Sequence, residues 1–214
     1  MRAGSRSAAS QGVGPFVHCV AVDTMKLFKS LFFALSLALG AAGCANADVR
    51  VGIHLDLFPD LVPIPGYPVY YAPQVQANFF FYDGAYWLYT DDGWYMSYWY
   101  NGPWDYVDPD FVPWFVLRVP VRYYRVPPPY FWGWYRDEPP RWGSYWGPSW
   151  SSRHYGWDRW DRSYVPRRAP LPSYQRQYTG DRYPDYREQR ELHDRNYNYR
   201  PQEQTHERQC THRP

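Results

Sequence analysis

The sequence predicts an α+β protein: a small antiparallel β-meander rich in aromatic side chains, followed by a proline-rich irregular chain with one or two short helices and a disordered tail. Two observations lead to this fold class. Between residues 78 and 107, aromatic runs are interrupted at regular intervals by Asp-Gly or Asn-Gly pairs, which favour the positive φ angles of tight hairpin turns. Beyond residue 140, in contrast, only two stretches have helical spacing, and prolines separate them.

The central stretch is expected to contain three strands with aromatic side chains on both faces. The strands are predicted at residues 78–82, 86–90 and 94–99. The turns that follow them are predicted at Asp83-Gly84, Asp91-Asp92-Gly93 and Asn101-Gly102. Side chains alternate along a strand, so Tyr86 and Leu88 share one face while Trp87 and Tyr89 share the other. Two arrangements remain open: one face packs on the chain and the other binds a ligand, or the proline-rich flanks cover both.

Flanking segments are expected to complete a β-meander domain that spans residues 48–124. Alternating apolar residues predict a half-buried strand at 48–57. Prolines and tyrosines at 63–73 predict a polyproline-like arm that covers an aromatic face, because proline cannot take part in the interior of a sheet. Further strands are predicted at 104–107 and, in an edge position, at 112–124.

A proline-, tryptophan- and arginine-rich region is expected at residues 125–197. Tryptophans recur every four residues from Trp142 to Trp150, which predicts a helical stretch, although the glycines and the proline within it argue against one long helix. Residues 184–196 begin with proline and carry mixed charges, which favours a second short helix. The polar residues 198–214 are predicted to be a disordered tail.

The N-terminal part of the chain carries signs of export. Residues 25–47 combine two lysines, an apolar run and small residues, the layout of a secretory signal peptide, so residues 1–24 are interpreted as a non-native extension. Two processing sites compete: cleavage between Ala47 and Asp48, which leaves a soluble chain, and acylation of Cys44 in a lipobox-like sequence. The predicted location is the periplasm or the exterior, with an outer- or inner-membrane lipoprotein as the alternative.

Charge is divided unevenly along the mature chain. Residues 48–116 contain one arginine and nine acidic residues, whereas residues 117–214 contain 18 arginines and eleven acidic residues. This asymmetry favours docking of one half on the other, since a guanidinium group stacks on aromatic rings and pairs with carboxylates. The near-neutral total and the predicted export argue against a nucleic-acid partner.

Six blocks of the mature chain resemble a group of exported proteins of proteobacteria. The blocks are YPVYYAP (67–73), FFFYDGAYWLY (79–89), WYNGPW (99–104), VLRVPVRYY (116–124), PPRWGSYWG (139–147) and GWDRWDR (156–162). The resemblance covers nearly all of the mature chain and implies a signal peptide, an envelope location and an aromatic, proline-rich body. Such proteins are often labelled lipoproteins or transmembrane proteins. The group has no established activity, so the resemblance implies no catalytic residue.

Carboxylates gather beside the aromatic residues, which is also the composition of sugar-processing clefts. They are Asp91, Asp92, Asp105, Asp108 and Asp110. Turn and loop positions explain them more simply, and no activated nucleophile, phosphate-binding loop or dinucleotide motif accompanies them. Tail residues His206, Cys210 and His212 are interpreted as solvated rather than metal-bound. We therefore expect no enzyme activity, no cofactor and no metal site.

The most specific site hypothesis is a stacking surface for sugar rings. Its residues are Trp87, Tyr89, Trp94, Tyr98 and Trp99. Exposed aromatic patches mark interaction sites, and the flat apolar faces of sugar rings pack on them without a catalyst. Two functions follow. The protein is either a non-catalytic structural or interaction module of the cell envelope with a protein partner, or a module that binds carbohydrate or peptidoglycan, and it meets the membrane only through its signal anchor or a lipid.

Overall fold

The computed structural model describes residues 53–200. The predicted N-terminal extension and signal peptide, with Cys44 and the Ala47–Asp48 cleavage site, lie outside the described residues, as do residues 201–214 of the predicted tail. Within the part of the chain that is described, no helix is long and apolar enough to cross a membrane.

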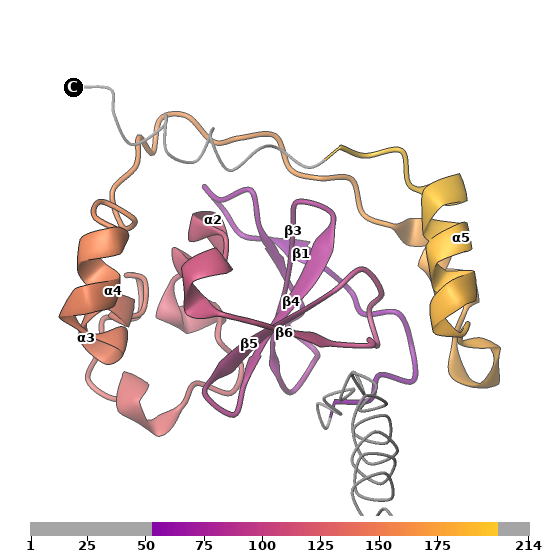
Figure 1. The fold of residues 1–214 in the computed structure, drawn as a ribbon, viewed down its shortest axis with the longest axis horizontal. Coiled ribbons are helices and arrows are strands. Elements are labelled where there is room, and N and C mark those ends of the chain that lie inside the picture. The colour runs from indigo at the N-terminus through magenta and orange to yellow at the C-terminus, as the bar shows by residue number, and fades with distance from the viewer. Residues whose placement is uncertain (1–52, 201–214) are drawn as a thin grey trace, which may run out of the picture. The chain divides into compact units, whose positions relative to one another are not determined.

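Six antiparallel strands form a meander in which each strand pairs with the next one in sequence (Figure 1). The strands are β1 (Val62–Pro63), β2 (Tyr70–Tyr71), β3 (Asn78–Tyr82), β4 (Ala85–Thr90), β5 (Gly93–Ser97) and β6 (Asp105–Val107). The three central strands lie within about two residues of their predicted bounds, and β6 lies inside the predicted strand 104–107. The aromatic meander is therefore confirmed.

Two tight turns connect the central strands, and both central residues of each turn have positive φ. Asp83 and Gly84 have φ angles of 53° and 88°, and Asp91 and Asp92 have φ angles of 47° and 58°. This is the geometry of a type I′ hairpin turn, whose twist matches that of the flanking strands. Aspartate tolerates it because its short side chain can bond to nearby backbone groups.

Gly93 was expected in the second turn but belongs to the strand. It pairs with Thr90 across the β4–β5 ladder. Its missing side chain serves packing, since a Cβ atom there would lie 3.2 Å from the ring of Tyr95 and 3.3 Å from the ring of Tyr106. The two aspartates alone therefore form the turn.

Two predictions for residues 48–73 are wrong in detail. In the described part of the predicted strand 48–57, residues 53–57 form no strand. The sheet begins instead inside the proline-rich segment, where Pro63 of β1 pairs with Tyr70 of β2. Proline is tolerated there because β1 is the edge strand, where a missing N–H group faces away from the ladder.

The predicted edge strand at 112–124 is a series of short helical turns instead. With the turn before them, they are η2 (Pro109–Phe111), α2 (Trp114–Leu117) and η3 (Val121–Tyr123). Pro113 and Pro120 immediately precede α2 and η3. Each proline lacks the N–H group that a ladder needs, so the strand pattern is broken twice and the chain turns at both places.

Short helices follow, in greater number than the one or two expected. They are η4 (Pro129–Phe131), α3 (Trp142–Trp146), α4 (Pro148–Arg153), η5 (Ser173–Gln177), η6 (Gly180–Arg182) and α5 (Tyr186–Asn196). Gly147 has a φ angle of 87° and precedes Pro148, so the tryptophan stretch is divided into two helices as its glycines indicated. Asp185 caps α5 by accepting a 2.9 Å hydrogen bond from the backbone N–H of Glu188.

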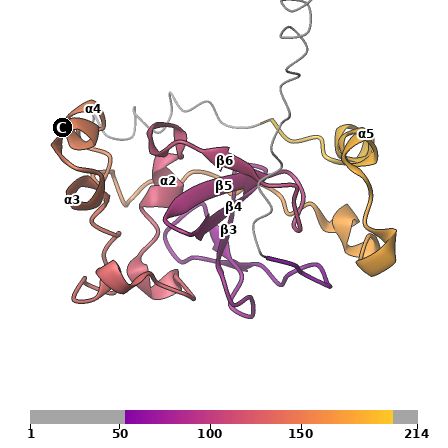
Figure 2. The same ribbon diagram turned by 60° about the horizontal axis from the view of Figure 1, so that its bottom comes forward.

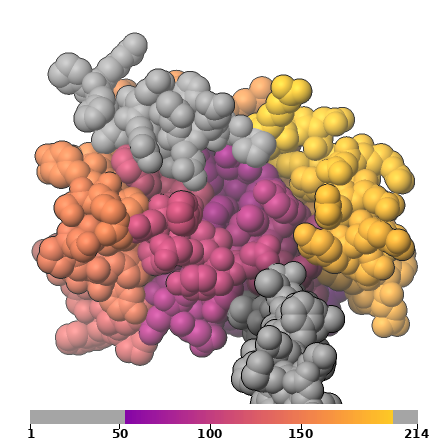
Figure 3. All heavy atoms as spheres, in the orientation of Figure 1, coloured from indigo at the N-terminus to yellow at the C-terminus, as the bar shows by residue number. Residues whose placement is uncertain are grey.

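Both faces of the sheet are buried, so the second of the two open arrangements is confirmed. On one face, Trp87 lies in a cluster with side chains of α2, α3 and α4, including Trp142. On the other face, Tyr86 and Leu88 lie in a cluster with C-terminal residues, including Tyr197. Figure 2 shows α3 and α4 on one side of the strands and α5 on the other. In Figure 3 the yellow C-terminal segment lies directly against the strands.

We expect Gly84→Ala to destabilise the protein more than Gly66→Ala. Both glycines have positive φ, 88° and 77°, which costs a residue with a side chain about 1–2 kcal/mol. An added Cβ atom at Gly66 meets nothing within 4 Å, whereas at Gly84 it would lie 3.2 Å from ring atoms of both Tyr197 and Tyr199. Urea unfolding should therefore show an additional loss of about 1–3 kcal/mol for Gly84→Ala. Equal losses would contradict the close contact between this turn and the C-terminal tyrosines.

Candidate functional site

Four of the five predicted stacking residues are buried and present no open ring face. The exposed fractions are 8% for Trp87, 2% for Tyr89, 1% for Trp94 and 2% for Trp99. The expectation of an open aromatic platform on the sheet is therefore corrected at these positions. Tyr98 differs from them, since 51% of its surface is exposed.

Aromatic side chains of the chain itself occupy the space that a ligand would need on the sheet. The ring of Trp142 lies with its centroid 5.1 Å from that of Tyr89 and 6.0 Å from that of Trp94. The indole N–H of Trp99 donates a 3.1 Å hydrogen bond to the backbone carbonyl of Gln189 in α5. These residues are therefore core and are held by ring packing, with a hydrogen bond from the indole N–H in the case of Trp99.

Tyr98 stands at a cleft between the end of β5 and helix α5, here called the Tyr98 cleft. The cleft has a volume of about 360 Å³. It is lined by Ser97, Tyr98, Trp99, Pro103, Asp105, Tyr186, Gln189, Arg190, His193 and Asp194. Tyr186, in the first turn of α5, is 62% exposed, so two accessible phenol rings border the cleft. The cleft combines apolar ring faces with acidic, basic and amide groups.

Hydrogen bonds hold α5 against the connection 98–104. The side-chain amide of Gln189 donates to the carbonyl oxygens of Gly102 at 3.2 Å and Pro184 at 3.0 Å. The hydroxyl of Tyr183 donates to the carbonyl of Gly102 at 2.7 Å and also accepts a hydrogen bond of 3.1 Å from the backbone N–H of Asn101. The two walls of the Tyr98 cleft are therefore tied to each other, so the cleft exists before a ligand arrives.

His193 connects the walls of the Tyr98 cleft. Its ring centroid lies 5.4 Å from that of Tyr98, and its Nδ1 atom lies 3.2 Å from the hydroxyl oxygen of Tyr174. Burial lowers the pKa of His193 below its ordinary value, while the negative charge of Asp194 opposes the shift. The imidazole is therefore mainly neutral at pH 7.

We expect the free energy of unfolding to fall as the pH drops below about 6.5, the ordinary pKa of histidine, and His193→Gln to reduce this fall. Below that pH the unfolded chain binds a proton at His193, whereas the folded protein resists protonation until the pH passes its lowered pKa. The group therefore costs nothing at pH 7.5 and destabilises the fold in acid. Denaturant unfolding at pH 7.5 and 5.5 measures the effect. An unchanged pH dependence in the variant would contradict the burial of this imidazole.

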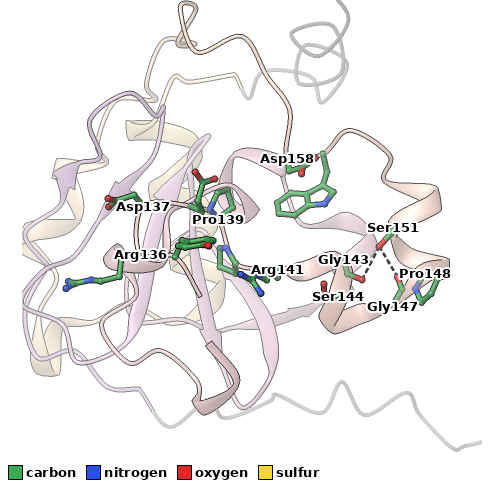
Figure 4. Close-up of a pocket in the computed structure, with 14 residues that line it drawn as sticks. Arg136, Asp137, Pro139, Arg141, Gly143, Ser144, Gly147, Pro148, Ser151 and Asp158 are labelled. Carbon is green, nitrogen blue, oxygen red and sulfur yellow. Dashed lines mark hydrogen bonds between the residues drawn. The ribbon is translucent and has the colours of Figure 1, made fainter. Parts of the chain in front are cut away.

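A second hollow, here called the arginine groove, lies between residues 135–141 and helices α3 and α4 (Figure 4). Its volume is about 1170 Å³. It is lined by Tyr135, Arg136, Asp137, Glu138, Pro139, Pro140, Arg141, Gly143, Ser144, Gly147, Pro148, Ser151, Trp157 and Asp158. In the view of Figure 4, the carboxylates of Asp137 and Asp158 lie toward one side and the side chains of Arg136 and Arg141 toward the other. Both signs of charge therefore border one groove.

The predicted acidic cluster is dispersed among several roles. Asp91 and Asp92 form the β4–β5 turn, as the simpler interpretation held. Asp108 caps η2 by accepting a 2.9 Å hydrogen bond from the backbone N–H of Asp110, and Asp105 lines the Tyr98 cleft. Within residues 53–200, no group of three or more His, Cys, Asp or Glu side chains is arranged to hold a metal ion.

Arginines of the basic half do bind the acidic half, through a carboxylate and through backbone carbonyls. Arg153 pairs with Asp110 through two hydrogen bonds of 3.0 Å, and these bonds lower the pKa of Asp110. Arg168 instead donates to the backbone carbonyls of Tyr67 and Ile64, each at 3.1 Å. The charge asymmetry thus corresponds to real contacts between the halves, and backbone oxygens as well as a carboxylate accept the bonds.

Sequence reasoning recognised the helix at 184–196 but missed that it forms one wall of a cleft. Tyr186, Arg190 and His193 occur at positions i, i+4 and i+7 of α5, a spacing that places them on one face. That spacing was the available signal. Its partner, the connection after β5, lies about 90 residues earlier in the chain, so no local pattern joins the two walls.

No protein-family model matches this chain, and neither does any curated protein or solved structure.

Proposed function

We propose that the protein is a non-catalytic binding protein of the cell envelope and that the Tyr98 cleft holds sugar rings of an envelope glycan such as peptidoglycan. The observation that carries the proposal is the pair of exposed rings, Tyr98 and Tyr186, at a cleft whose walls are already tied together. The envelope location rests on the signal-like segment at residues 25–47.

The chemistry of the cleft suits a sugar. One face of a pyranose ring carries mainly C–H groups, which pack on the flat face of a tyrosine, while the ring hydroxyls need hydrogen-bond donors and acceptors. Asp105, Arg190 and Asp194 supply such groups beside the rings. The volume of about 360 Å³ lies near the lower end of the range for small-ligand sites and suits roughly one or two sugar rings.

The buried sheet supports a scaffold role within the same proposal. Trp94 and Trp99 are nearly inaccessible, so the meander positions the cleft rather than touching the ligand with its faces. Trp99 forms part of the cleft floor and bonds α5 through its indole N–H. A floor of this kind favours rigid placement of Tyr98 and Tyr186, which limits the entropy lost on binding.

We expect Tyr98→Ala and Tyr186→Ala each to weaken binding of soluble peptidoglycan disaccharide fragments by roughly tenfold, because each removes one stacking face. Titration calorimetry on the full chain measures the affinity. The matched control is Tyr106→Ala: this tyrosine is 55% exposed but does not line the Tyr98 cleft, so its removal should leave binding unchanged.

Two outcomes would contradict the proposal. If the folded protein shows no saturable binding to peptidoglycan fragments or to neutral polysaccharides, the cleft does not serve a glycan, and the structural role with a protein partner takes its place. If Tyr106→Ala weakens binding as much as the cleft variants do, the sugar is held elsewhere on the surface.

A further inference from the structure

The arginine groove has a wall that is fixed by the fold. The backbone N–H groups of Val121 and Arg122 donate to the carbonyl oxygens of Glu138 and Arg136 at 3.0 and 2.9 Å. The side chain of Arg122 also forms an ion pair of 2.9 Å with Asp137. This wall is therefore held in place without any ligand, and the charge of Asp137 is already balanced.

The side of the groove formed by α3 and α4 is lined mainly by small residues. Gly143 and Gly147 line the groove, and the hydroxyl of Ser151 lies 3.0 Å from the carbonyl oxygen of each glycine (Figure 4). A Cβ atom at Gly143 would lie 2.7 Å from Oγ of Ser151, so a side chain there would displace the serine hydroxyl from the two carbonyl oxygens. Small residues therefore border this part of the groove and leave room for an extended ligand.

Four charged side chains of the groove have no partner of opposite charge among residues 53–200. Arg136 and Arg141 form no ion pair with a carboxylate, and Glu138 and Asp158 form none with a guanidinium. The guanidinium of Arg141 lies 5.7 Å from the centroid of the ring of Tyr135, a contact that orients it by cation–π attraction. The groove thus offers two positive and two negative groups to one ligand.

This pattern selects among ligand classes. Phosphate-rich chains are repelled by Glu138 and Asp158, and a neutral glycan would leave all four charges without partners. A ligand that carries both a carboxylate and an ammonium group satisfies both signs. The volume of about 1170 Å³ exceeds the ~300–1,000 Å³ typical of compact small-molecule sites, which favours an extended ligand.

We propose that the arginine groove binds a short zwitterionic peptide. Its carboxylate pairs with Arg141, its ammonium group pairs with Asp158, and its backbone lies over Gly143. This proposal concerns a site separate from the Tyr98 cleft and does not depend on the glycan proposal.

The probe for the test is tri-alanine with free termini, compared with its C-terminal amide and its N-acetyl form. In titrations of the full chain, we expect the amide and the acetylated peptide each to bind about tenfold more weakly, because each loses one charge-assisted contact. Arg141→Gln should bind the free acid and the amide alike, and Asp158→Asn should bind the free amine and the acetylated peptide alike.

Two matched variants serve as controls. Arg187→Gln removes an exposed arginine that does not line the groove, and Tyr98→Ala alters only the other cleft, so tri-alanine binding should be unchanged in both. Absence of tri-alanine binding by the folded protein would overturn the proposal. So would equal affinity for the three peptides, or an effect of Arg187→Gln equal to that of Arg141→Gln, since either result would assign binding to nonspecific charge.

Discussion

The sheet of this protein is aromatic on both faces, so neither face can remain in water. Phe80 and Trp87 line one face and Phe81 and Tyr86 the other, and all four are buried. Burial of rings of this size is strongly favourable, and the hydrophobic effect that drives it does not require a particular orientation of the groups in contact. Segments with little regular structure can therefore cover the sheet. Segments from residues 112–199 supply much of both covering layers, and residues before β3 add to one of them.

Covering a sheet with irregular chain buries backbone and indole polar groups, and these groups then need hydrogen-bond partners. Arginine and aromatic side chains provide several of these partners. Arg118, which is fully buried, donates hydrogen bonds to the backbone carbonyls of Trp157 and Arg159. The indole N–H of Trp142 donates to the backbone carbonyl of Leu117 at 3.0 Å. Some buried polar groups have no hydrogen-bond partner in the described structure. The buried indole N–H groups of Trp87, Trp94 and Trp104 have no acceptor in the described structure, each at a cost of about 1–3 kcal/mol that the ring packing must offset.

Both hollows lie where covering segments meet other parts of the fold. The Tyr98 cleft follows from the docking of α5 on the connection after β5, and the arginine groove from the approach of residues 135–141 to α3 and α4. In each case glycine or a buried hydrogen bond brings the backbones close and leaves charged or aromatic side chains at the border. The buried sheet provides a rigid support, and the segments that cover it provide most of the charged and aromatic side chains that line the two hollows.

The sequence by itself determined the local elements: the central strands, their alternating faces, the interruption of the tryptophan stretch by its glycines and proline, and the helix at 184–196. Period, turn chemistry and helix capping act between residues close in the chain and can be read there. Only the tertiary structure decided that Trp94 and Trp99 are core while Tyr98 is open, and that Pro63 pairs at an edge. Whether a side chain is exposed, or a strand lies at an edge, depends on which distant segments pack against it. The local sequence pattern of a strand does not identify those segments.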